Sequence, residues 1–146
     1  MKPLPRRALL AAALAPGAAF TAAARDQTLT QGPTANPALR AAMQRARELR
    51  DEAVRQGDQA FGAVVLCGDR IVGLGPSRVV VNNDPTAHAE IEALRDAART
   101  LKQRDLSGCL LVSTSRPCRM CEAAAGWARI SRMIHSESLS DAGTPS

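Results

Sequence analysis

Apolar positions along residues 37–56 recur every three or four residues, which is the spacing of one face of an α-helix. The members of this stripe are Leu39, Ala42, Met43, Ala46, Leu49, Ala53 and Val54. Pro37 suits the first turn of a helix, and Gly57 is a common residue just after one. The pattern therefore predicts a helix over residues 37–56.

Further along the chain, short β-rich runs alternate with helical stripes. Two runs flank the Gly68-Asp69 turn and predict a hairpin with strands at 61–67 and 71–75. After a loop over 76–84, the pattern predicts four more elements: a helix at 86–101, a strand at 106–114 with its core at 109–113, a helix at 117–128 and a short strand at 132–135. The order αββαβαβ is typical of a layered α/β domain.

The first 24 residues have the composition of an export signal. They contain no acidic residue, and Arg6-Arg7 precede a short apolar run over 8–15 that leads to small residues at 21–24. A membrane anchor is the alternative, but the run is shorter than the roughly 20 residues that span a bilayer. The paired arginines leave both twin-arginine and ordinary secretory export open. We expect a mature chain that starts near Arg25, without a stable membrane anchor.

Removal of this leader changes the charge of the chain. The full sequence has 19 basic and 14 acidic residues, a formal charge of +5, and three of the basic residues lie in the leader. The mature part then has little excess of positive charge, and Phe61 and Trp127 are its aromatic residues. Binding of single-stranded nucleic acid uses basic grooves and aromatic platforms. We therefore expect no nucleic-acid partner.

The candidate chemistry lies in a motif of two parts, His88-Ala89-Glu90 and Pro117-Cys118-Arg119-Met120-Cys121. Each part opens a predicted helix, and the i, i+3 spacing places both sulfurs on one helix face. His88, Cys118 and Cys121 supply three zinc ligands, which leaves a fourth tetrahedral position for water, as in catalytic zinc sites. The field at a helix N-terminus favours the thiolate forms of the two cysteines.

Glu90 is the candidate catalytic residue. Zinc lowers the pKa of a bound water towards about 7. A carboxylate beside the metal could take the proton of that water and pass it to a ring nitrogen and to leaving ammonia. H-x-E…P-C-x-x-C is already known as the signature of zinc-dependent base deaminases.

Other interpretations of the cysteines stay open. A structural Cys₂His zinc site is one, although such sites usually have a fourth protein ligand. A redox pair or disulfide between Cys118 and Cys121 is another. For Cys67 and Cys109 we favour buried, small apolar side chains over a disulfide. His135 is expected to be an ordinary strand residue.

At these residues the chain resembles the cytidine and deoxycytidylate deaminase superfamily. Residues 83–91 (NDPTAHAEI) and 118–121 (CRMC) most resemble the branch of guanine deaminases and tRNA adenosine deaminases. Residues 61–65 fit the first strand of that branch, and Trp127-Ala128-Arg129 resembles guanine deaminases in particular. The resemblance implies a three-layer α-β-α fold with a central mixed sheet of four to five strands, one zinc ion per chain and a homodimer.

The resemblance also defines candidate substrate contacts and three departures. Ser77 and Ala89 are the candidate contacts, although many relatives have Asn where Ser77 stands. Relatives commonly have Glu before the Pro-Cys, where this chain has Arg116. The sequence ends at Ser146, soon after the fourth predicted strand, whereas relatives continue into a further strand and helix.

The sequence thus predicts four segments: an export signal at 1–24, a flexible tail at 25–36, a deaminase domain at 37–136 and a short tail at 137–146. The expected function is zinc-dependent hydrolytic deamination of a free nucleobase or nucleoside, guanine-like ahead of cytidine-like. The expected location is the periplasm or the medium, or the cytoplasm if the leader is not functional. A tRNA adenosine deaminase and a non-catalytic, zinc-folded base-binding protein are the alternatives.

Overall fold

A computed structural model describes residues 36–145. The predicted leader, and the predicted tail except for Asn36, lie outside the described residues. The elements, in chain order, are α2 (Pro37–Arg55), β1 (Gly62–Cys67), β2 (Arg70–Pro76), α3 (Ala89–Leu101), β3 (Cys109–Ser113), α4 (Arg119–Trp127), β4 (Arg132–His135) and β5 (Ser140–Gly143). Within these residues, no helix is both long enough and apolar enough to cross a membrane.

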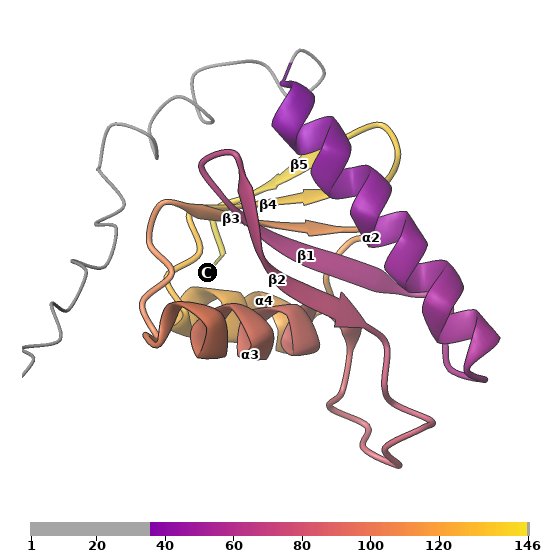
Figure 1. The fold of residues 1–146 in the computed structure, drawn as a ribbon. Coiled ribbons are helices and arrows are strands. Elements are labelled where there is room, and N and C mark those ends of the chain that lie inside the picture. Colours follow the sequence, from indigo (N-terminus) through magenta and orange to yellow (C-terminus); the bar gives the residue numbers. More distant parts are fainter. Residues whose placement is uncertain (1–35, 146) are drawn as a thin grey trace, which may run out of the picture.

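The five strands form one mixed sheet in the order β2-β1-β3-β4-β5. β1 is antiparallel to both β2 and β3, β3 and β4 are parallel, and β4 and β5 are antiparallel. Helix α2 covers one face of the sheet, and α3 and α4 lie on the other face (Figure 1). The predicted three-layer α/β fold is confirmed.

The central strand β1 contributes to both cores because it is buried along its whole length. Its side chains alternate: Ala63 and Val65 belong to the core beneath α3 and α4, whereas Val64 and Leu66 belong to the core beneath α2. Helix α2 contributes its predicted apolar stripe, of which Val54 alone is exposed.

Three element starts differ from the sequence prediction by two or three residues, and one predicted tail contains a strand. Helix α3 begins at Ala89 instead of Thr86, α4 begins at Arg119 instead of Pro117, and β3 begins at Cys109 instead of Leu106. The predicted tail over 137–146 contains β5, which pairs with β4 through a tight turn. β5 lacks the apolar alternation that reveals a half-buried strand, so its pairing comes from position at the sheet edge.

The interpretation of Cys67 and Cys109 as separate apolar side chains is wrong in this structure. The two residues face each other in the antiparallel register of β1 and β3 and form a disulfide. Both remain buried in the core beneath α3 and α4. The sequence pattern placed each cysteine in a strand, but the pairing register that opposes them is a tertiary property.

Candidate metal centre and active site

The two halves of the motif start two neighbouring helices in the same way. His88 is the N-cap of α3 and Cys118 is the N-cap of α4, and both have extended backbone angles. Neither side chain caps its own helix by a hydrogen bond, so both remain available to a ligand. Glu90 and Cys121 follow in the first turns of these helices. The helix starts, which the sequence placed two or three residues too early, are defined by these two N-caps.

Two glycines of β2 allow α3 to lie against the sheet. A Cβ at Gly75 would overlap the carbonyl oxygen of Ala89, and one at Gly73 would overlap that of Ala93. The first turn of α3, which holds Glu90, therefore approaches the β2 backbone more closely than any side chain would permit.

A buried carboxylate fixes the loop that leads to His88. Asp58 accepts hydrogen bonds from the Ser77 hydroxyl (2.7 Å) and from the backbone N–H groups of Gln59 (2.8 Å), Val80 (2.9 Å) and Val81 (2.9 Å). Burial alone would raise the pKa of Asp58, but these four hydrogen bonds outweigh it and hold the pKa below its ordinary value. Ser77 is fully buried and is used in this network.

Three potential metal ligands converge at the start of α3 and α4. The Nδ1 atom of His88 lies 3.7 Å from the Cys118 sulfur and 3.6 Å from the Cys121 sulfur, and the sulfurs are 3.6 Å apart. In a tetrahedral zinc site, bonds of about 2.3 Å to sulfur and about 2.05 Å to nitrogen give S–S edges of about 3.8 Å and S–N edges of about 3.6 Å. The donor atoms therefore have the identity and the spacing that zinc requires.

This triad also bears on the alternative interpretations. Among the described residues it is the one group of three or more His, Cys, Asp or Glu side chains with metal-ligand spacing, and no fourth ligand belongs to it. A closed structural site normally has four protein ligands. The two cysteines are free thiols in this structure, not a disulfide. An open, three-ligand site is the arrangement that the geometry favours.

Glu90 stands beside the triad and is 5% exposed. Its Oε2 atom lies 3.6 Å from the Cys121 sulfur. Burial raises the pKa of the Glu90 carboxyl. Burial, with Glu90 as a negative neighbour, also raises the pKa of the Cys121 thiol. A cation held by the triad would favour the thiolate form of Cys121.

A pocket of about 120 Å³ opens at this centre. Its lining comprises Phe61, His88, Ala89, Glu90, Ser115, Arg116 and Cys118. Ala89, a predicted substrate contact, belongs to it, whereas the other predicted contact, Ser77, does not. Phe61, Ser115 and Arg116 were not predicted as contacts. Position in the sequence was the one signal for them: Phe61 directly precedes β1, and Ser115 and Arg116 lie between the end of β3 and the Pro-Cys.

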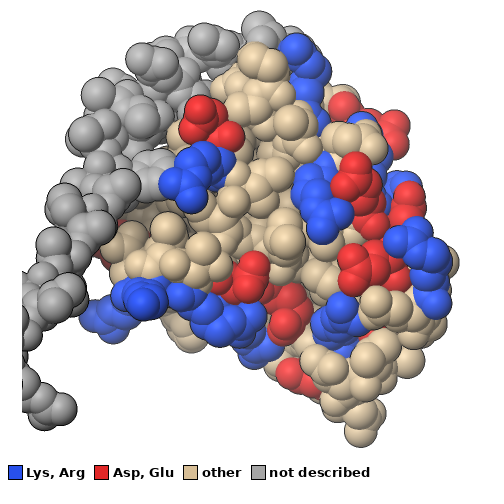
Figure 2. Space-filling view, viewed as in Figure 1, with Lys and Arg blue, Asp and Glu red and all other residues tan. Residues whose placement is uncertain are grey.

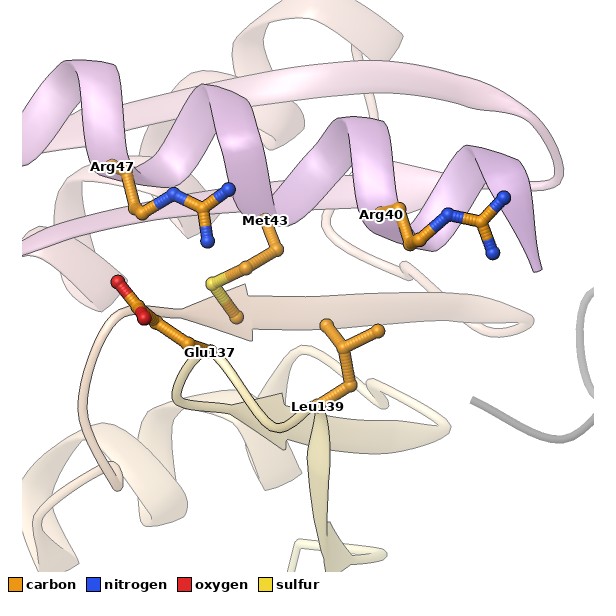
Figure 3. Close-up of a pocket in the computed structure, with 5 residues that line it drawn as sticks. All are labelled: Arg40, Met43, Arg47, Glu137 and Leu139. Atoms are coloured by element: carbon orange, nitrogen blue, oxygen red, sulfur yellow. The ribbon is translucent and has the colours of Figure 1, made fainter. Parts of the chain in front are cut away.

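A second pocket, of about 230 Å³, lies on the opposite side of the sheet. Met43 of α2 and Leu139 of the β4–β5 turn point toward each other there (Figure 3). Arg47 and Glu137 lie at one end of this pocket and Arg40 at the other (Figure 3). It shares no lining residue with the metal centre.

Residues 37–137 match the family model of the cytidine and deoxycytidylate deaminase zinc-binding region. The chain therefore belongs to this family. It is 38% identical over 101 residues to the guanine deaminase of Bacillus subtilis. The aligned residues are 68% of this chain and 65% of that relative. It is 44% identical over 78 residues to a tRNA-specific adenosine deaminase of Buchnera aphidicola. Here the aligned residues are 53% of this chain and 48% of that relative. These values confirm the predicted branch.

Solved structures of the same two groups share the fold. The X-ray structure of the Bacillus subtilis guanine deaminase matches with a TM-score of 0.63 and 37% identity, over 66% of this chain and 62% of that one. A structure of a tRNA:A34 deaminase matches with a TM-score of 0.63 and 36% identity, over 65% and 69% of the two chains. The chain spans about half to two thirds of the length of the curated relatives described above.

Proposed function

We propose that the protein is a zinc-dependent hydrolytic deaminase that converts an amino group on a free nucleobase or nucleoside, with guanine favoured, to a carbonyl. The observation that carries the proposal is the three-ligand triad with the buried carboxylate of Glu90 beside it and a small pocket at its mouth. The likeness to the guanine deaminase supports the choice of guanine.

In this proposal His88, Cys118 and Cys121 hold one zinc ion per chain. When bound, zinc supplies a positive charge that lowers the pKa of a water and makes it a nucleophile at neutral pH. Glu90 accepts one proton from the attacking water and donates it to the ring nitrogen; it then accepts the proton of the newly added hydroxyl group and donates it to the amino group, which leaves as ammonia while the carbonyl forms. Its raised pKa suits a group that must both accept and release a proton near neutral pH. Phe61 offers an aromatic ring on which the planar base can stack.

The test is release of ammonia from a panel of free bases and nucleosides by the zinc-loaded protein. Glu90→Gln keeps the size of the side chain but removes the proton acceptor, so kcat should fall by about 10²–10⁴-fold at equal zinc content. Equal rates for the two proteins would contradict the mechanism. Tight base binding without turnover by either protein would instead favour the base-binding alternative.

Deamination of adenosine in tRNA is the second candidate, and the tRNA-specific relatives favour it. The face seen in Figure 2 and the ion pairs of α3 support the small-molecule proposal instead. Basic and acidic side chains lie next to one another on the face in Figure 2, and ion pairs such as Arg95–Glu92 and Arg99–Asp96 follow α3. Nucleic-acid binding typically uses a basic stripe. Inosine formation in purified tRNA at rates above those on free bases would reverse the order of the two candidates.

We further propose that the protein is exported and acts as a homodimer. The leader pattern supports export, and so does the Cys67–Cys109 disulfide, since such bonds persist mainly in oxidising compartments. Mass spectrometry of the protein from the periplasm or medium should find a mature N-terminus near Arg25; retention of residues 1–24 in the cytoplasm would contradict export. Sedimentation equilibrium at twice the monomer mass is the expected result for the dimer.

A further inference from the structure

Arg116 gives the pocket a positive charge that the deamination chemistry does not use. It precedes Pro117 and Cys118 in the connection from β3 to α4, is exposed, and lines the pocket together with Glu90 and Cys118. We propose that Arg116 selects substrates that carry an anionic group, a phosphate or a carboxylate, on the amidine ring or on a substituent of that ring. This inference rests on the proposed function, because it specifies the substrate class of the same site.

The ion pairs of the structure leave this guanidinium available. Among residues 36–145, Arg116 takes part in none of the ion pairs that join arginines to carboxylates. Over residues 36–145, no carboxylate lies within ion-pair distance of Arg116. The acidic residue of the pocket lining is Glu90, which is buried and directed to Cys121. Arg116 is thus a pocket cation without an internal counter-ion among these residues.

The size of the pocket determines where an anionic group would lie. A volume of about 120 Å³ is well below the roughly 300–1,000 Å³ of pockets for drug-sized ligands. It suits one small ring system, placed between Phe61 and the metal centre. A substituent of that ring must project to the mouth, where the exposed Arg116 lies. Its planar guanidinium matches the geometry of phosphate or carboxylate oxygens.

Apart from Glu90, the surroundings of Arg116 add no carboxylate to the lining. Its other members are the aromatic Phe61, the imidazole of His88, the small Ala89 and Ser115, and Cys118. Arg119, at the first position of α4, adds a second exposed guanidinium next to Cys118. Of the two, Arg116 is the one that lines the pocket, so it is the arginine that would attract a carboxylate or phosphate at the mouth.

The experiment compares matched neutral and anionic substrates with the zinc-loaded mature protein. The pairs are guanosine with its 5′-monophosphate, cytidine with its 5′-monophosphate, and cytosine with cytosine-5-carboxylate. We expect kcat/KM to be about ten-fold or more higher for the anionic member of at least one pair, and the preference to weaken as salt rises. Preference in the first two pairs identifies a phosphate, and preference in the third identifies a carboxylate.

Substitution of Arg116 then tests the residue. Arg116→Gln should lower the ratio of kcat/KM between anionic and neutral members by about 10–100-fold, the value of a charge-assisted hydrogen bond. Arg116→Glu should lower it further, and Arg116→Lys should retain part of it. The matched control is Arg104→Gln, an exposed arginine beyond the opposite end of α3, which should leave the ratio unchanged.

A binding measurement makes the result independent of turnover. The Kd of each ligand is measured on zinc-loaded Glu90→Gln protein with and without Arg116→Gln. The same loss of preference for the anionic ligand is expected. The inference would be overturned if Arg116→Gln left the ratio between anionic and neutral members unchanged, or if the native protein preferred the neutral members. Turnover of neutral bases would still uphold the proposed function in that case. Absence of turnover on every substrate would overturn the proposed function, and the Kd values would still decide the role of Arg116.

Discussion

The two cysteine pairs lie at opposite ends of the same two strands and have different chemistry. Cys67 ends β1 and Cys109 begins β3, and the antiparallel register joins them in a disulfide. Cys118 and Cys121 follow the other end of β3 and remain thiols. The first pair belongs to the apolar core beneath α3 and α4, whereas His88 and Glu90 converge on the second. The neighbours that the fold supplies decide whether two cysteines form a covalent bond or a metal site.

The largest expected effect is the loss of a metal ligand at the end of the sheet that holds Cys118 and Cys121, the thiol end. Cys121→Ser should weaken zinc binding by more than about 100-fold, because even changes to residues behind the ligands cost about 10–100-fold. Competition with a chromophoric chelator measures the affinity. The matched control is the double variant Cys67→Ser/Cys109→Ser, whose zinc affinity should equal that of the native protein. If the control lost zinc and Cys121→Ser kept it, the assignment of the two pairs would be reversed.

At the end that holds the Cys67–Cys109 disulfide, the expected effect is on the free energy of unfolding. The bond closes a loop with a sequence separation of 42 residues, so replacing both cysteines by alanine should cost about 4 kcal/mol in the chain-entropy account. Urea denaturation at fixed zinc concentration measures it. A cost below about 1 kcal/mol would show that the bond adds little to stability.

Thiol titration separates the two pairs directly. The denatured, metal-free protein should expose two reactive thiols before reduction and four after it, since the chain has four cysteines. Four thiols before reduction would contradict the disulfide.

The comparison also explains which features were predictable from sequence. The convergence of His88, Cys118 and Cys121 was predictable, because their spacing is local to two helix starts and each ligand type has a defined chemistry. The disulfide was not, because Cys67 and Cys109 meet only through a strand register that short apolar runs leave undefined. Ser77 was a candidate substrate contact because it stands after the second strand, where many relatives have Asn, but the buried carboxylate of Asp58 accepts a hydrogen bond from its hydroxyl. From the sequence Arg116 was a departure from the family pattern, and the fold shows that it lines the pocket.

Asp58 offers the smallest and most specific test, because it supports the thiol end without contacting the metal ligands. Its four hydrogen bonds fix the loop before His88, and Asp58→Asn would set an amide N–H against backbone N–H donors. We expect a loss of about 2–3 kcal/mol in the free energy of unfolding at pH 7. Zinc affinity should fall by less than in Cys121→Ser, and the disulfide should form as before.

The loss should depend on pH in a defined direction. The pKa of Asp58 is lowered in the folded protein, so its ionisation stabilises the fold above the unfolded pKa of about 3.9. That stabilisation disappears as pH falls from about 4 through the lower folded-state pKa. Urea denaturation of both proteins between pH 7 and pH 3 should therefore show a constant difference down to about pH 4 and a shrinking one below it. Ser77→Ala, which removes one of the four hydrogen bonds but keeps the carboxylate, should retain most of the pH dependence of the native protein. A difference between native protein and Asp58→Asn that stayed the same to pH 3 would mean that the charge of Asp58 does not stabilise the loop.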